Sequence, residues 1–343
     1  MIRQYCGQLP RACHRYLLLY GILLWIITSP ADAGNLRDKA AAIKSPLSLH
    51  SLLLDGAAAD GLMAVVGERG HILTSTDAGR SWRQANVPTR VTLTGVFLQD
   101  ARLGWAVGHD ATILRTTDGG RSWVIVYSAP EEERPFLDVW FRDAQNGFAI
   151  GAYGLFMVTA DGGDSWFSSP LNDEDDFHLN HIARAPDGKL FIAAEAGTLY
   201  RSDDGGETWV SLPSPYQGSF FGTLPLSGDA LLAFGLRGHL FRSEDAGQSW
   251  ASVNSGTEAM LTSALELKSG DCIIAGLSGV LLTSRDGCRN FNLRQLAERE
   301  GISSLLAGTE DTVLLLGEAG VRRISLSDYS ERETLYLQPE AVR

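Results

Sequence analysis

The sequence predicts an all-β fold, a seven-bladed β-propeller built from four-stranded antiparallel blades. Three observations support this prediction. One unit of about 42 residues recurs along the chain, each unit holds four short apolar stretches separated by turn residues, and helical periodicity is nearly absent. A four-stranded sheet of this size is apolar on both faces, so it must pack against neighbours, and a closed ring of such sheets covers every face.

The repeat is clearest in a segment that starts at a small residue and ends at a tryptophan. Five copies occupy residues 67–82, 108–123, 151–166, 194–209 and 235–250. Their tryptophans are 41, 43, 43 and 41 residues apart, a regularity that chance does not produce. A weaker sixth copy spans 276–291, and a seventh, starting at Gly317, keeps its two glycines but little else. The sequence therefore predicts seven units.

Within one unit, the apolar stretches predict strands and the polar residues between them predict turns. In the second unit, the expected strands are 93–98, 103–107, 112–116 and 123–127. Residues 37–43 and 292–300 are the exceptions, and we expect short helical connectors there. Residues 334–337 are expected to form a strand of the closing blade.

The N-terminal segment has the pattern of an export signal. Arginines precede an apolar run at 16–27, which is shorter than the roughly 20 residues that cross a membrane, and Ala31-Asp32-Ala33 provides a cleavage pattern. We expect a signal peptide at 1–33, a linker at 34–48 and the propeller at 49–343, with no membrane span after cleavage. An uncleaved anchor is the alternative. The expected location is the periplasm, or the thylakoid lumen in a photosynthetic source.

The composition narrows the class of function. The chain has 29 Lys and Arg against 41 Asp and Glu, a net charge of −12, which argues against a nucleic-acid partner because a polyanion needs a basic stripe. The sequence contains no phosphate-binding loop, no metal-ligand cluster and no Ser-His-Asp context. We therefore expect no cofactor, no metal and no catalytic residue, and we expect a monomer.

Two of the four cysteines lie within the export signal, which leaves Cys272 and Cys288. Disulfides persist in an oxidising compartment, so a structural disulfide between these two residues is the preferred interpretation. Cys272 is expected to begin the second strand of the sixth unit, and Cys288 falls in the turn after the third. Antiparallel neighbours at that point can reach the Cα separation of about 5.5 Å that a disulfide needs.

The end of each repeat carries the pattern Ser/Thr-x-Asp-x-Gly-x-Ser/Thr-Trp. A carboxylate in a tight hairpin turn accepts hydrogen bonds from nearby backbone amides, and the tryptophan can pack over the turn and between sheets. We therefore expect these residues to be structural. The aspartates are Asp77, Asp118, Asp161, Asp204 and Asp245, and the tryptophans are Trp82, Trp123, Trp166, Trp209 and Trp250.

These units resemble the BNR or Asp-box repeat. The run 108–123, GHDATILRTTDGGRSW, is similar to the signature of the propeller family of photosystem II stability and assembly factors, and the resemblance covers about residues 49–325. It implies a non-enzymatic protein-binding propeller that assists the assembly or stability of a membrane protein complex. The client would be photosystem II in a photosynthetic source, and otherwise a bacterial envelope protein or complex.

Asp boxes also occur in sialidases and other glycoside hydrolases, so an Asp-box enzyme is an alternative function. The sialidase Arg-Ile-Pro motif is absent, and sialidases have six blades where the repeat predicts seven. A two-carboxylate glycosidase stays open, because so many acidic residues can supply a suitably spaced pair. A structural adaptor of an envelope transport system is the other alternative.

The first candidate partner site is an arginine that recurs just before the box, at Arg115, Arg201 and Arg242. The resemblance implies that they contribute to an arginine patch of the kind that the related assembly factors present. The structural alternative is that each guanidinium stacks on a neighbouring indole and pairs with a box carboxylate.

The second candidate is a charged rim on the opposite face, where two acidic insertions lie between consecutive blades. It would bind a basic partner segment with aromatic anchors, although a solvated rim is the plainer interpretation. We expect Phe220 and Phe221 to be an exposed pair. The acidic candidates are Glu131, Glu132, Glu133, Asp173, Asp175 and Asp176, and the aromatic candidates are Tyr153, Tyr216 and Phe221.

Overall fold

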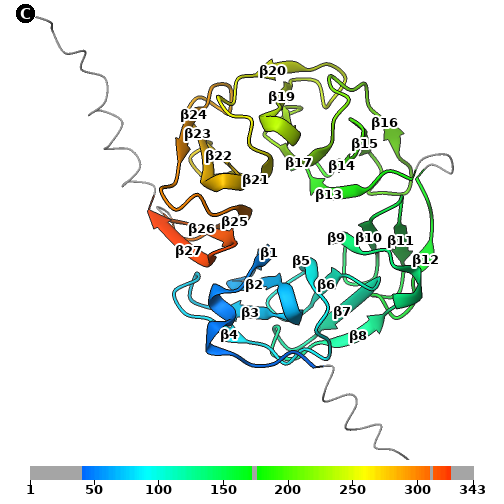
Figure 1. Ribbon diagram of the computed structural model, residues 1–343. Coiled ribbons are helices and arrows are strands. Elements are labelled where there is room, and N and C mark those ends of the chain that lie inside the picture. Colours follow the sequence, from blue (N-terminus) through cyan, green and yellow to red (C-terminus); the bar gives the residue numbers. More distant parts are fainter. Residues whose placement is uncertain (1–40, 172–175, 310–311, 326–343) are drawn as a thin grey trace, which may run out of the picture.

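The computed structural model describes residues 41–171, 176–309 and 312–325. These residues form seven antiparallel sheets that surround a central axis like the blades of a wheel (Figure 1). Six sheets have four strands and the last has three, and each strand pairs with the next along the chain. The predicted seven-bladed β-propeller is confirmed.

The blades are numbered in chain order. Blade 1 contains β1 (Leu53–Ala59), β2 (Leu62–Gly67), β3 (Ile72–Ser75) and β4 (Arg83–Gln84). Blade 2 contains β5 (Leu93–Leu98), β6 (Gly104–Gly108), β7 (Thr112–Thr116) and β8 (Val124–Tyr127). Blade 3 contains β9 (Phe136–Phe141), β10 (Gly147–Gly151), β11 (Phe156–Thr159) and β12 (Phe167–Ser168). Blade 4 contains β13 (Leu179–Arg184), β14 (Leu190–Ala194), β15 (Leu199–Ser202) and β16 (Val210–Ser211).

The remaining blades follow the same order. Blade 5 contains β17 (Phe220–Pro225), β18 (Leu231–Gly235), β19 (Leu240–Ser243) and β20 (Ala251–Val253). Blade 6 contains β21 (Leu261–Glu266), β22 (Cys272–Gly276), β23 (Val280–Ser284) and β24 (Asn292–Gln295). Blade 7 contains β25 (Ile302–Ala307), β26 (Thr312–Gly317) and β27 (Gly320–Ser325).

Helix is limited to short 3-10 turns in the described part of the chain. They are η1 (Pro46–His50), η2 (Glu68–Gly70), η3 (Pro130–Glu132), η4 (Leu236–Gly238) and η5 (Leu277–Gly279). Within these residues, no helix is long and apolar enough to cross a membrane.

One expected connector is wrong. Residues 292–300 do not begin with a helix, because Asn292–Gln295 form β24, the outer strand of blade 6, which pairs with β23. The pairing with an existing strand edge outweighs the weak helical propensity of this stretch. Of the stretch 37–43, only 41–43 are described, and they are not helical. The export signal at 1–33 and the expected strand at 334–337 lie outside the described residues.

Apolar side chains fill the spaces between adjacent blades. Leu62, Ala64 and Val66 of β2 pack with Val96 and Leu114 of blade 2, and similar clusters follow at the next junctions. Between the last blade and the first, Leu314 and Leu316 pack with Leu53 and Val65. Each blade is therefore stabilised by two neighbours, as the apolar faces of the repeat require.

The first strand of every blade contains a bulge at the channel. In each of these strands the pairing register with the second strand shifts by one residue near the strand's start. A bulge changes the direction in which side chains point, and here at least two residues of each first strand line one central cavity. The bulged residues are Leu54, Thr94, Leu137, Asn180, Phe221, Thr262 and Ser303.

The first strands contact one another around the whole ring, and β1 contacts β25. Hydrogen bonds from channel side chains reinforce these contacts. Asp55 accepts one from Val96 N at 2.9 Å, Asp138 accepts one from Ile182 N at 2.8 Å, and Ser304 Oγ donates one to Asp55 at 3.1 Å. The ring is thus closed between the last blade and the first.

Candidate functional site

The box aspartates serve the turns that contain them. In blade 3, Asp161 accepts hydrogen bonds from Ser165 N at 2.9 Å, from the Ser165 hydroxyl, and from Thr159 Oγ1 at 2.9 Å. The hydroxyl bond from Ser165 is the largest of the interactions that lower the pKa of Asp161, to about 2. The carboxylate of Asp161 is therefore ionised, and hydrogen bonds within its own turn use its oxygen atoms. The boxes of the other blades that carry one repeat this arrangement, at Asp77, Asp118, Asp204, Asp245 and Asp286.

The box tryptophans pack toward the preceding blade. Trp123 is 3% exposed and belongs to the cluster between blades 1 and 2, and Trp166 is 8% exposed between blades 2 and 3. Trp82, Trp209 and Trp250 are half-buried. The indoles therefore act in blade packing.

Arg115 fastens the box turn of the next blade. Its Nη1 donates a 3.0 Å hydrogen bond to the carbonyl of Gly162 and pairs with Asp164 at 2.8 Å. Trp105 Nε1 donates to the same carbonyl at 3.0 Å. Gly163, at φ 91°, lies so close that an added Cβ would be 3.1 Å from Trp105 Nε1. Two donors from blade 2 thus hold the blade 3 turn.

Arg201 and Arg242 repeat this contact at later junctions. Arg201 Nη1 donates to Ala246 O at 3.1 Å, and Arg242 Nη1 donates to Gly287 O at 2.9 Å. Both also pair with an acidic residue of their own blade, Asp203 and Glu244. The structural alternative predicted that each arginine pairs with a box aspartate. The arginines instead bind backbone carbonyls of the box turn and acidic residues beside the box.

The three arginines are also poorly accessible. The side chains of Arg115, Arg201 and Arg242 are 24%, 17% and 9% exposed. Only a small part of each side chain is accessible to a partner protein. These arginines are therefore better explained as contacts between adjacent blades than as a surface patch.

The junction between blades 1 and 2 lacks these tryptophan and arginine side-chain donors. Backbone hydrogen bonds still join it, because Asn86 N donates to Arg121 O and Trp123 N donates to Asn86 O, both at 3.0 Å.

In the aligned repeats, Ala64 takes the place of Trp105 and Thr74 takes the place of Arg115. The two large donors are therefore missing at this junction, and the small side chain of Thr74 lies against the box turn of blade 2, where a Cβ added at Gly120 would be 2.6 Å from Thr74 Cγ2. A crevice of about 790 Å³ opens there, lined by the box turns and by the first hairpins of both blades.

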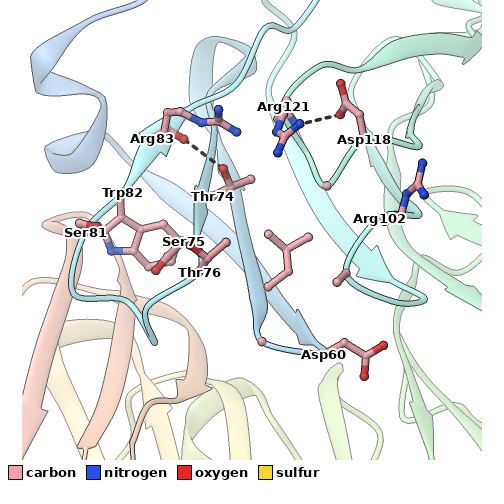
Figure 2. A pocket seen from close by; sticks show the side chains of 14 residues that line it. Asp60, Thr74, Ser75, Thr76, Ser81, Trp82, Arg83, Arg102, Asp118 and Arg121 are labelled. Carbon is pink, nitrogen blue, oxygen red and sulfur yellow. Dashed lines mark hydrogen bonds between the residues drawn. The ribbon is translucent and has the colours of Figure 1, made fainter.

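Three arginines surround this crevice, Arg83 on blade 1 and Arg102 and Arg121 on blade 2 (Figure 2). Among the described residues, none of their guanidinium groups has an ion pair or a hydrogen bond. Asp60 and Asp118 also line the crevice, but Asp118 already accepts hydrogen bonds from Ser122 N and the Ser122 hydroxyl. The crevice is thus a basic spot on a chain with a net charge of −12.

The sequence analysis missed these three arginines because they occupy unrelated positions of the repeat. Arg83 follows a box tryptophan, Arg102 lies in a first hairpin and Arg121 lies inside a box. The sequence does show that blade 1 has the small residues Ala64 and Thr74 where blade 2 has Trp105 and Arg115. This difference indicates a crevice only once the inter-blade contacts of Trp105 and Arg115 are known.

The candidate acidic rim is only partly described. Glu131, Glu132 and Glu133 are exposed around η3, and Glu132 pairs with Arg134. Asp176 is exposed, whereas Asp173 and Asp175 lie outside the described residues.

Two of the aromatic candidates are exposed or partly exposed. Tyr153 is 55% exposed and its ring lies edge-on to His178, with a centroid distance of 4.9 Å. Tyr216 is half-buried and stacks on His239 at 4.2 Å.

The expected exposed pair at 220–221 is wrong. Phe220 is fully buried in the cluster between blades 4 and 5, and Phe221 is the bulged residue of β17 and lines the central cavity. Phe220 packs against Tyr216, with ring centroids 5.9 Å apart, whereas the bulge brings Phe221 to the channel and away from Tyr153 and Tyr216.

Cys272 and Cys288 form a disulfide with a Cα separation of 5.5 Å. Cys272 is the first residue of β22, and Cys288 lies in the turn after β23 at φ 64°. The sixth repeat lacks the box tryptophan, and the disulfide joins this turn to the sheet in its place.

Comparison with known proteins relates the chain to one family. Residues 127–262 match the family model described as photosynthesis system II assembly factor YCF48. No curated protein sequence matches the chain.

Solved structures share the fold at low sequence identity. The structure described as YCF48 bound to D1 peptide is 20% identical, with a TM-score of 0.66, and the match covers 83% of this chain and 96% of that one. YCF48 from Cyanidioschyzon merolae is 16% identical, with a TM-score of 0.66 and coverage of 84% and 99%. A streptogramin B lyase is 14% identical, with a TM-score of 0.68 and coverage of 82% and 95%.

The likeness to these structures shows the propeller, and the lyase illustrates that propellers also carry enzymes. The family match adds the repeat type, which agrees with the six box turns described above. The chain is a propeller of BNR-type repeats, and its residues 127–262 match the photosystem II assembly factor family.

Proposed function

We propose that this chain is an exported, non-enzymatic propeller that binds a segment of a membrane protein and assists the assembly or stability of its complex. The observation that carries the proposal is the crevice between blades 1 and 2. The guanidinium groups of Arg83, Arg102 and Arg121 line it and have no ion pair or hydrogen bond within the part of the chain that the structure describes. The solved structure of a family member with a D1 peptide supports a peptide as the kind of ligand.

The chemistry of the crevice favours an acidic segment or a free C-terminal carboxylate. Arginine binds a carboxylate through two parallel N–H···O bonds, and three unpaired forks can hold more than one such group. A volume of about 790 Å³ accommodates several side chains of an extended segment. The client would be a photosystem II subunit in a photosynthetic source and a subunit of an envelope complex otherwise.

Two features support action on the exported side of a membrane. The first 33 residues have the pattern of an export signal, and the Cys272–Cys288 disulfide is typical of an oxidising compartment. The occupied box carboxylates support a role without catalysis, because none of them is free to act as an acid, base or nucleophile.

The test is charge reversal in the crevice. The variant Arg83→Glu, Arg102→Glu, Arg121→Glu should lose capture of its membrane protein partner from a solubilised envelope, measured by crosslinking and mass spectrometry. Arg184→Glu, Arg237→Glu, Arg299→Glu is the matched control, because those three arginines are exposed, lie on other blades and produce the same change in net charge.

Two results would refute the proposed site. If the crevice variant captures the partner as well as the native protein does, the crevice is not the docking site. If the control variant loses capture equally, net charge rather than the crevice governs the interaction.

A further inference from the structure

The segment that precedes the first strand, residues 41–50, lies across the ring instead of leaving it. Ala42 N donates a 2.9 Å hydrogen bond to Val87 O, in the link between blades 1 and 2, and Ala42 also packs against the apolar cluster between these blades. At the other end of the segment, η1 contacts β27 of blade 7. We call residues 41–45 the strap.

The side chain of Gln84 on β4 holds the strap at two backbone groups. Its Oε1 accepts a 2.8 Å hydrogen bond from Ser45 N, and its Nε2 donates a 3.0 Å hydrogen bond to Ile43 O. A backbone N–H can only donate and a backbone carbonyl can only accept, so these two partners fix which end of the amide carries the nitrogen. The orientation of the Gln84 amide is therefore determined.

The fixed amide in turn determines the protonation of His71, which lies between η2 and β3 and is 4% exposed. Nε2 of Gln84 lies 3.0 Å from Nδ1 of His71. Because an amide nitrogen only donates, Nδ1 must accept this hydrogen bond, and the imidazole must be neutral with its proton on Nε2.

A protonated His71 is incompatible with this arrangement. Its Nδ1–H would point at the N–H of Gln84, so two donors would face each other. If Gln84 turned its amide over to accept from the imidazolium, its oxygen would face Ile43 O and its nitrogen would face Ser45 N. Either response costs the strap the hydrogen bonds that hold it to blade 1.

The surroundings of His71 favour the neutral imidazole. Burial is the main cause that lowers its pKa, and the charges of Glu68 and Arg69 act on it in opposite directions. The other titratable residues of the strap, η1 and the link between blades 1 and 2 are Lys44, His50 and Arg90. Each of these three is a cation or becomes one, so none of them stabilises an imidazolium.

We propose that residues 41–45 form an acid-sensitive strap, which Gln84 holds while His71 is neutral and which is released when His71 gains a proton. The strap is separate from the crevice, whose lining includes neither Gln84 nor any residue of the strap. The test therefore needs no membrane partner, and its outcome is independent of the proposed function.

Hydrogen exchange read by mass spectrometry tests the strap in the mature protein, because it measures local opening. The protection of residues 41–50, corrected for the intrinsic pH dependence of exchange, is measured from pH 7.5 to pH 4.5. We expect it to fall by about tenfold or more in the native protein, because backbone groups of the strap lose their partners. Peptides from β14 in blade 4 are the internal reference and should keep their protection.

Two pairs of variants assign the effect. In His71→Asn, an amide oxygen takes the place of Nδ1 as the acceptor and does not titrate, so the strap should stay protected at every pH. His239→Asn is the matched control, because His239 holds the same position in the repeat of blade 5, and it should keep the native pH dependence. Gln84→Ala should lose protection of the strap already at pH 7.5, whereas Gln145→Ala, at an exposed glutamine, should not.

Three results would overturn the proposal. The first is protection of the strap in the folded native protein that stays constant from pH 7.5 to pH 4.5, or that falls only together with that of β14; this result requires no variant. The second is the same loss of protection in His71→Asn as in the native protein, which would assign the pH dependence to another group. The third is native protection of the strap in Gln84→Ala.

Discussion

The hydroxyl of Ser304 donates a 3.1 Å hydrogen bond to Oδ1 of Asp55, and the two residues are 249 positions apart in the sequence. Ser304 belongs to β25 in the last described blade and Asp55 to β1 in the first. Asp55 also accepts Val96 N from blade 2 at 2.9 Å, so one carboxyl group links three consecutive blades. The closure of the ring therefore depends partly on a single polar side chain in the channel.

Ser304→Ala should destabilise the protein by about 1–3 kcal/mol, because it removes a buried hydrogen bond to a carboxyl group. The measurement is the free energy of unfolding from urea denaturation. Ser303→Ala is the matched control, since Ser303 lines the same cavity and has no side-chain hydrogen bond in the described structure, and its change should stay within about 0.5 kcal/mol. Equal effects of the two substitutions would show that this link does not stabilise the ring.

Arg242→Ala should destabilise the propeller by about 1–3 kcal/mol, because it leaves the carbonyl of Gly287 and the buried carbonyl of Cys288 without this donor. Arg242→Lys should restore little, since a point-like ammonium cannot reproduce the fork that contacts Gly287 and Glu244 together. Arg184→Ala, at an exposed residue without such contacts, is the control. If Arg242→Ala loses partner capture but keeps its stability, Arg242 contributes to partner binding rather than to blade packing.

Removal of the disulfide by Cys272→Ala, Cys288→Ala should lower the free energy of unfolding by about 3 kcal/mol, the chain-entropy value for a loop of this length. Unfolding of the native protein with and without a reducing agent provides the same comparison without a substitution. Thiol titration of the unfolded, non-reduced mature protein should detect no free cysteine. Two free thiols would contradict the disulfide.

Asp55 and Asp138 should make the protein less stable as the pH rises from about 4 to about 7, whereas His71 and His181, whose pKa values burial lowers, act in the opposite direction. Burial raises the pKa of both aspartates to about 7 in the folded chain from an ordinary pKa of 3.8 when unfolded, so the folded state holds more protons in this range. Their contribution is complete below pH 4 and lost above pH 7. Thermal unfolding of the native protein is therefore compared with that of Asp55→Asn, Asp138→Asn, and the Tm of the native protein relative to the variant should fall as the pH rises across this range. A Tm difference between the two proteins that does not change with pH would contradict the raised pKa values.

The repeat predicts most of the fold, because the apolar stretches and turn residues within each unit indicate its strands and turns. The spacing of the tryptophans gives the number of blades, and the polar turn residues separate the strands. The stretch 292–300 was misjudged because an outer edge strand is held mainly by its pairing with β23 and has little pattern of its own.

The sites are less visible in the sequence because they arise between units. The crevice depends on Ala64 and Thr74, two small residues whose meaning appears only when blade 1 stands beside blade 2. The channel depends on Asp55 and Asp138, which look like ordinary interruptions of apolar strands until the ring brings them to one cavity. Phe221 was misplaced for the same reason, since a bulge decides which way its ring points.

Site-specific photo-crosslinking tests the central claim most directly. A photoreactive residue is placed at position 102 in the crevice, at position 131 on the acidic rim, or at position 184 on blade 4, and the exported protein is irradiated in its native envelope. The account predicts that position 102 crosslinks to an integral membrane protein and that position 184 does not. Crosslinks to a membrane protein from position 131 alone, or from none of the three, would contradict the crevice as the docking site.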